Sequence, residues 1–151
     1  MTVLNDAIVK AASVLAERPE TRKAIVVLSD GMDTHSKATA EKALDVAMAT
    51  GASIYTVDMS ATDGNASRDR QSAAVLRNFA EKSGARFVST PGGPALRDAF
   101  ATIAQELGHQ YTIAYRPLNQ ARDGRWRNIE VKLSRDNVAV RTRKGYRAPR
   151  K

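Results

Sequence analysis

The sequence predicts an α/β domain in which helices cover both faces of a partial parallel sheet, giving three layers. The chain has 151 residues, which is enough for one domain with a genuine core. Residues 24–28 read Ala-Ile-Val-Val-Leu, and an apolar run of this kind is typical of a strand buried on both faces. Strand-like and helix-like segments then alternate up to residue 108, as parallel strands joined by right-handed crossovers require.

The first half of the chain predicts two helices around the apolar strand. Apolar residues at helical spacing indicate an amphipathic helix from about residue 3 to residue 17, with Thr2 placed as its N-cap. The strand follows at Ala24 to Leu28. A second helix is expected over residues 40–48, and Gly51 is placed to end it in a left-handed conformation.

The next part of the chain repeats this alternation. A strand is predicted at Ser53 to Val57, and the polar stretch from Ser60 to Arg70 predicts a surface loop. A third helix ends at Gly84, and a short strand follows at Arg86 to Ser89. The turn Pro91-Gly92-Gly93-Pro94 opens a fourth helix.

The pattern changes at His109 from helical spacing to strict alternation. Polar and apolar residues alternate at Tyr111 to Tyr115, at Ile129 to Leu133 and at Val138 to Val140, which predicts half-exposed antiparallel strands. We therefore expect an α/β core over residues 1–108. The basic extension, residues 109–151, should be an antiparallel β segment packed on the same sheet or extending it.

The positive charge of the chain lies in the basic extension. Its net charge is +8, and residues 109–151 hold 12 Lys or Arg against 3 Asp or Glu, whereas residues 1–108 hold 12 against 13. A basic surface is predicted at Arg125, Arg127, Lys132, Arg141, Arg143 and Lys144. Such a surface suits an acidic partner or a nucleic acid, and it is equally typical of a solvated outer face.

Several classes of chemistry are excluded or left without support. The chain has no cysteine, which excludes thiol catalysis and disulfides. No apolar run approaches the roughly 18 residues of a membrane span. The first 20 residues carry charges on an amphipathic pattern, unlike the apolar core of a signal peptide.

Two acids follow the apolar strand directly, at Asp30 and Asp33. Ligands of open parallel sheets bind beyond the carboxyl ends of the strands, so this is the expected ligand-facing edge. One hypothesis is a metal-dependent hydrolase that uses Asp30 and Asp33 as its acid and base. The two histidines, His35 and His109, stand in no motif that supports it.

Six segments in order along nearly the whole chain carry a family resemblance. They are Thr2 to Ile8, Val27 to Thr34 (Val-Leu-Ser-Asp-Gly-Met-Asp-Thr), Ile54 to Val57, Phe79 to Gly84, Gln110 to Pro117 (Gln-Tyr-Thr-Ile-Ala-Tyr-Arg-Pro) and Arg143 to Tyr146. The sequence resembles the second half of a von Willebrand factor type A domain, in the bacterial VWFA-related group with a basic β extension. That resemblance implies a three-layer, Rossmann-like fold.

The resemblance also implies a metal-ion-dependent adhesion site for Mg²⁺. Thr2 matches the family's Thr loop and Asp30 its Asp loop, while the family's Asp-x-Ser-x-Ser loop has no counterpart here. Asp6 and Asp33 are candidate supporting residues, and Asp58 and Ser60 imitate the missing motif. Two ligands of about six predict that Mg²⁺ binds weakly or in a site completed by a partner.

The family's strand order places an absent strand beside residues 24–28. We therefore expect Ile25, Val26, Val27 and Leu28 to form an open edge that self-associates about a two-fold axis or is completed by another polypeptide. The expected function is a non-enzymatic protein-interaction or assembly module that contacts its partner by strand pairing or through an acidic group. A basic module for acidic partners stays an alternative, with nucleic acid disfavoured. The family suggests a secreted or periplasmic bacterial protein.

Overall fold

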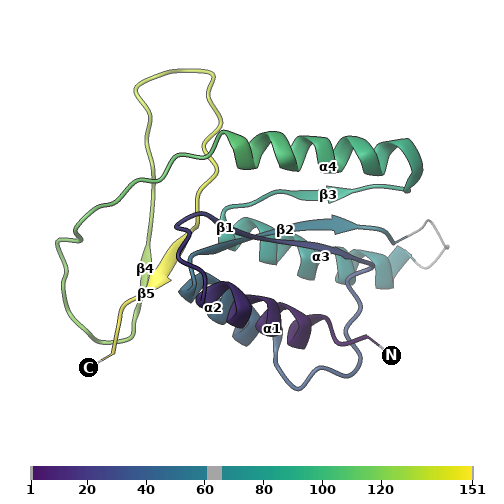
Figure 1. Ribbon diagram of the computed structural model, residues 1–151, viewed down its shortest axis with the longest axis horizontal. Helices are drawn as coiled ribbons and strands as arrows, with labels where there is room; N and C mark the ends of the chain where they lie inside the picture. Colours follow the sequence, from purple (N-terminus) through teal and green to yellow (C-terminus); the bar gives the residue numbers. More distant parts are fainter. Residues whose placement is uncertain (1, 61–65, 151) are drawn as a thin grey trace.

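The computed structural model describes residues 2–60 and 66–150 (Figure 1). Its elements, in chain order, are α1 (Leu4–Ala16), β1 (Lys23–Ser29), α2 (Ala40–Ala49), β2 (Ala52–Asp58), α3 (Ala66–Ser83), β3 (Phe87–Ser89), α4 (Gly93–Gly108), β4 (Trp126–Asn128) and β5 (Gly145–Arg147). The expected mixed α/β class is confirmed: a three-stranded parallel sheet is flanked by helices and accompanied by a small antiparallel pair.

The parallel sheet has the strand order β1-β2-β3, so β2 is central and β1 is an edge strand. In the β1–β2 register, Val26 lies opposite Tyr55 and Leu28 lies opposite Val57. Ser29 lies opposite Asp58, which brings the carboxyl ends of the two strands to the same edge of the sheet.

Helices pack on both faces of this sheet. One face carries Ile25, Val27 and Ile54, which form the larger core with apolar residues of α1, α2 and α3. The opposite face carries Tyr55 and Val57, which pack against α4 in a smaller core. Figure 1 shows α4 on one side of the strands and α1 and α2 on the other.

Local signals set most of the element boundaries. The Thr39 hydroxyl accepts a hydrogen bond from the backbone N–H of Lys42 at 3.2 Å and so caps α2. Gly51 follows α2 with φ of 79°, as predicted. The loop predicted from Ser60 to Arg70 is wrong from residue 66 onward, because α3 already begins at Ala66; residues 61–65 lie outside the described part. Extending a helix that is anchored by packing adds a hydrogen bond per residue, so its polar first turns still form.

The prediction that β1 is buried on both faces is wrong. Ile25 and Val27 are each 8% exposed, but Val26 and Leu28 are 41% and 47% exposed. The reason is that three helices share one face of the sheet, whereas on the other face the smaller core is built mainly from β2 and α4. The second face of β1 is therefore left open.

The basic extension contains less regular structure than its alternation predicts. Its strands β4 and β5 pair antiparallel in a separate two-stranded sheet, and the N–H of Ile129 continues the pairing to the carbonyl of Lys144 at 2.9 Å. The strand predicted at Tyr111 to Tyr115 belongs to no ladder, and neither do those at Ile129 to Leu133 and Val138 to Val140. A strand needs a hydrogen-bonded neighbour, and these segments form no ladder even where residues 129–131 and 140–142 line a common pocket beside the end of α3.

Candidate functional site

The carboxyl ends of β1 and β2 carry Asp30 and Asp58 in different surroundings. Asp30 is exposed, and its Oδ1 accepts the backbone N–H of Met32 at 3.0 Å within its own turn. Asp58 is only 3% exposed. Its Oδ1 accepts two hydrogen bonds from Ser60, one from the backbone N–H at 2.9 Å and one from the hydroxyl at 2.6 Å.

Thr2 lies against the loop that follows Asp30. Its backbone N–H donates to the Thr34 hydroxyl at 3.0 Å, and its carbonyl accepts the N–H groups of Thr34 and His35, each at 3.1 Å. The structure thus brings together the two loops on which Thr2 and Asp30 stand. The role predicted for Thr2 as N-cap is wrong, because Val3 occupies that position without a side-chain hydrogen bond.

The same loop caps α1 from a distance. Asp33 Oδ2 accepts the N–H of Asn5 at 2.8 Å, and the Ser36 hydroxyl accepts the N–H of Asp6 at 3.1 Å. In return, the Asp6 carboxylate accepts the N–H groups of Lys37 and Ala38, each at 2.9 Å. These residues are about 30 positions apart in sequence, so local patterns gave no signal of this reciprocal capping.

The Asp33 carboxyl is stabilised in its charged form. Partial burial raises its pKa, but hydrogen bonds from Asn5, Ser36 and His35 outweigh burial and hold the pKa below the ordinary value. The oxygen atoms of Asp33 and Asp6 are thus engaged with backbone donors, as well as being candidates for supporting a metal.

A complete metal site is not assembled in the described part of the chain. Within residues 2–60 and 66–150, no group of three or more His, Cys, Asp or Glu side chains is placed to hold an ion. The two histidines lie apart from any catalytic arrangement, since His35 Nδ1 lies 2.9 Å from the Thr34 hydroxyl and His109 Nδ1 lies 2.7 Å from the Gln105 carbonyl.

The free edge of β1 is a second candidate site. The Ser29 carbonyl accepts the N–H of Met59 at 3.0 Å, so Ser29 turns its backbone groups toward β2. Because alternate residues of a strand direct their backbone groups to opposite sides, those of Ala24, Val26 and Leu28 point to the open edge. Of the four predicted interface residues, only Val26 and Leu28 also expose their side chains; Ile25 and Val27 belong to the core.

The predicted basic surface is partly engaged in ion pairs within the chain. Arg127 contacts Asp123 at 3.0 Å, Lys132 contacts Glu130 at 3.5 Å, and Arg125 lies 3.9 Å from Asp123. Lys144 donates its backbone N–H to the Lys82 carbonyl at 3.2 Å, which joins the basic extension to the end of α3.

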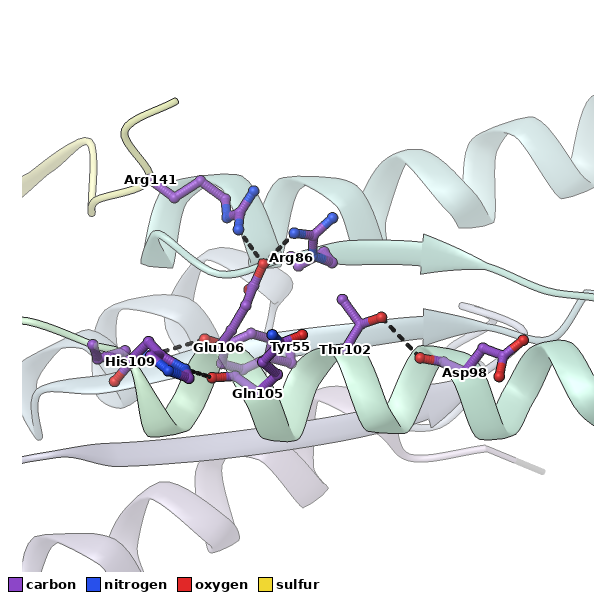
Figure 2. A network of polar contacts seen from close by, with 9 residues as sticks. Tyr55, Arg86, Asp98, Thr102, Gln105, Glu106, His109 and Arg141 are labelled. Carbon is purple, nitrogen blue, oxygen red and sulfur yellow. Dashed lines mark hydrogen bonds and ion pairs between the residues drawn. The ribbon is translucent and has the colours of Figure 1, made fainter. Parts of the chain in front are cut away.

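Polar contacts around Glu106 of α4 join the basic extension to the core (Figure 2). Glu106 Oε1 accepts from Arg86 Nε at 2.7 Å and also pairs with the guanidinium of Arg141. Nearby, the buried Tyr55 hydroxyl accepts a hydrogen bond from Gln110 Nε2 at 2.8 Å, and burial raises the pKa of Tyr55. The sequence did not predict that Glu106 pairs with these two arginines.

Comparisons with protein-family models, with curated proteins and with solved structures give no match for this chain. Among the helices that the structure describes, none is long and apolar enough to cross a membrane.

Proposed function

We propose that this protein is a non-enzymatic interaction and assembly module that pairs with a second copy of itself through the free edge of β1. The observation that carries the proposal is the position of β1 at the edge of the sheet with Val26 and Leu28 41% and 47% exposed. This edge offers unpaired backbone groups and apolar side chains at the same place.

Beyond Lys23 at its start, the edge lacks the features that usually prevent strand pairing. Natural edge strands are protected by proline, by inward-pointing charge or by bulges. Residues 24–28 contain no proline and no charged residue, and they run in unbroken register with β2. A second copy suits this edge because antiparallel pairing about a two-fold axis places the same strand on both sides of the interface.

A weak Mg²⁺ site at Thr2 and Asp30 is a secondary part of this proposal, with the remaining ligands supplied by a different, acidic polypeptide rather than by the second copy. The proximity of the two loops supports it. A basic module for acidic partners is less favoured, because acids of the same chain already pair with several of its arginines. A hydrolase that uses Asp30 and Asp33 is less favoured as well, since Asp33 is committed to capping α1.

The test is the oligomeric state measured by light scattering over a range of concentrations. We expect the wild-type chain to dimerise and Val26→Lys to shift it to monomer. Dimerisation of the variant would bury the charged lysine in an apolar interface, which is unfavourable. Val14→Lys is the matched control, since Val14 lies on α1 with a similar exposure of 45%. A wild-type chain that stays monomeric at high concentration, or equal dimerisation of the two variants, would overturn the proposal.

A further inference from the structure

We infer that the Tyr111–Tyr115 segment is a strand of this chain's own that closes the free edge of β1, in parallel orientation, and competes there with the second copy. Its regulatory consequence rests on the proposed function; the closure itself does not. The inference starts from the position of α4 relative to the sheet.

The strands β1, β2 and β3 follow one another in one direction across the sheet, and the position of α4 would carry the chain back in the opposite direction. From β1 to β2 to β3 the connecting helices α2 and α3 pack on the same face, whereas α4 packs on the opposite face. Parallel crossovers are right-handed in about 98% of cases. With α4 on that opposite face, the next parallel strand of a right-handed unit falls beside β1, at its free edge.

The segment that follows α4 has the composition of such a strand. Tyr111, Ile113 and Tyr115 alternate with Thr112 and Ala114, a pattern of β-branched and aromatic residues. The three large side chains are 94%, 73% and 56% exposed, and the segment belongs to no ladder. It is thus an extended apolar segment without a partner strand in a chain that also has an unpaired strand edge.

The segment starts close to that edge. Gln110 donates its hydrogen bond to the Tyr55 hydroxyl, and Tyr55 lies opposite Val26 in the β1–β2 register. Residue 110 is thus tied through its side chain to β2, the strand next to β1, and neighbouring strands are about 4.8 Å apart. Figure 1 shows the chain leaving the end of α4 toward β4 instead, which is the open arrangement.

The two surfaces are complementary in size. In a parallel register with Tyr111 beside Ala24, Ile113 lies beside Val26 and Tyr115 beside Leu28, so the large side chains cover the exposed ones. The small Thr112 and Ala114 then face the side already packed by α1. Closure would move Tyr115 away from Tyr146, which lies near it in the open arrangement.

The chain is long enough to close and return. β1 has seven residues, and a strand of that length spans about 23 Å. The linker from residue 116 to residue 125 has ten residues and reaches roughly 33 Å when extended, which allows β4 to stay where it is. Pro117, which has no N–H, stands where the added strand would end.

The test uses engineered cysteines, because the chain has none of its own. We expect Val26→Cys/Ile113→Cys to form an intramolecular disulfide on mild oxidation at least tenfold faster than the control pair Val26→Cys/Val138→Cys. Val138 is a matched control because it is also in the basic extension and is 52% exposed. Equal rates would overturn the inference, and so would a product that consists mainly of disulfide-linked dimers.

Hydrogen exchange on the unaltered chain keeps the test independent of the variants' folding. Closure predicts slower exchange for the amides of Val26 and Leu28 than for those of residues 119–122, to an extent that does not change with protein concentration. Equally fast exchange, or protection that appears only at high concentration, contradicts it. Ile113→Asp should open the edge and raise the dimer fraction. If the cysteine pair closes but neither Ile113→Asp nor Val26→Lys changes the oligomeric state, the closure stands and the proposed self-assembly fails.

Discussion

Carboxylates near the top of the sheet act mainly on the backbone around them. Asp33 and Ser36 satisfy N–H groups in the first turn of α1, and Asp6 holds the backbone of the loop that carries them. The first N–H groups of a helix have no partner within it, and here a loop from elsewhere in the chain provides one. The sequence predicted that acids follow the first strand, but it did not predict which backbone N–H groups they accept.

Asp33→Asn tests this capping. The hydrogen bonds hold the pKa of Asp33 below its ordinary value, so its stabilising contribution is fully present above the unfolded-state pKa of about 4 and is lost as pH falls through the lower folded-state pKa. We expect Asp33→Asn to lose about 0.5–2 kcal/mol at pH 7 in urea unfolding and to approach wild type at acidic pH.

The control for this variant is Glu20→Gln, an exposed acid with no hydrogen bond to the rest of the described chain. It should leave the free energy of unfolding unchanged at both pH values. A loss for Asp33→Asn that stays constant as pH falls would show that packing, and not the charged carboxylate, is responsible.

The strength of Mg²⁺ binding depends on how many oxygen ligands the chain supplies. Thr2 and Asp30 provide at most two oxygen ligands, whereas Mg²⁺ prefers six in octahedral geometry. We therefore expect millimolar Mg²⁺ to leave the melting temperature of the chain unchanged, as measured by calorimetry. A saturable rise that Asp30→Asn abolishes would mean that the chain alone completes the site.

The apolar run of β1 predicted the strand itself but not the burial of its second face. Such a run predicted a strand and its direction, and both are confirmed by the parallel pairing with β2. Burial on the second face depends on a covering helix, and α4 packs mainly on β2. The exposure of Val26 and Leu28 is therefore a property of the arrangement of helices.

The end of α3 is a contact point between elements that a pair of glycines can test. Gly84 and Gly51 both end helices with φ near 80°. A Cβ at Gly84 would collide with the backbone of Thr142 and Arg143, whereas one at Gly51 would meet nothing within 4 Å. Both alanine variants carry the conformational strain, but only one pushes the basic extension away.

We therefore expect Gly84→Ala to lose at least about 1 kcal/mol more than Gly51→Ala in urea unfolding. Limited proteolysis should cleave residues 129–144 faster in Gly84→Ala alone. Equal losses and equal cleavage in the two variants would indicate that the basic extension does not pack on Gly84 in solution.

In the whole molecule, the basic extension is attached by a few polar contacts. Glu106 pairs with Arg86 and Arg141, while Arg147 reaches Glu41 at 3.0 Å and Asp45 at 2.9 Å on α2. Glu106 is the most buried of these acids, with its side chain 17% exposed. Two arginines of the extension, Arg141 and Arg147, thus hold it on the core.

Glu106→Gln should loosen this attachment. We expect a loss of roughly 1–2 kcal/mol, because charge-assisted hydrogen bonds to two guanidinium groups are weakened. Hydrogen exchange in residues 138–144 should accelerate, and the wild-type protection should fall as salt is added. Glu130→Gln, in an exposed pair with Lys132, is the control that should show neither effect.

From the sequence alone follow the local elements of the core: the order of helices and strands, the parallel sheet and the turn at Gly51. These follow from periodicity and backbone preference, which act over a few residues. Only the tertiary structure decided that Asp33 caps α1, that α4 leaves Val26 and Leu28 exposed, and that Tyr111 to Tyr115 lies without a partner. Burial and pairing depend on which segments meet across the fold, and spacing along the chain does not contain that information.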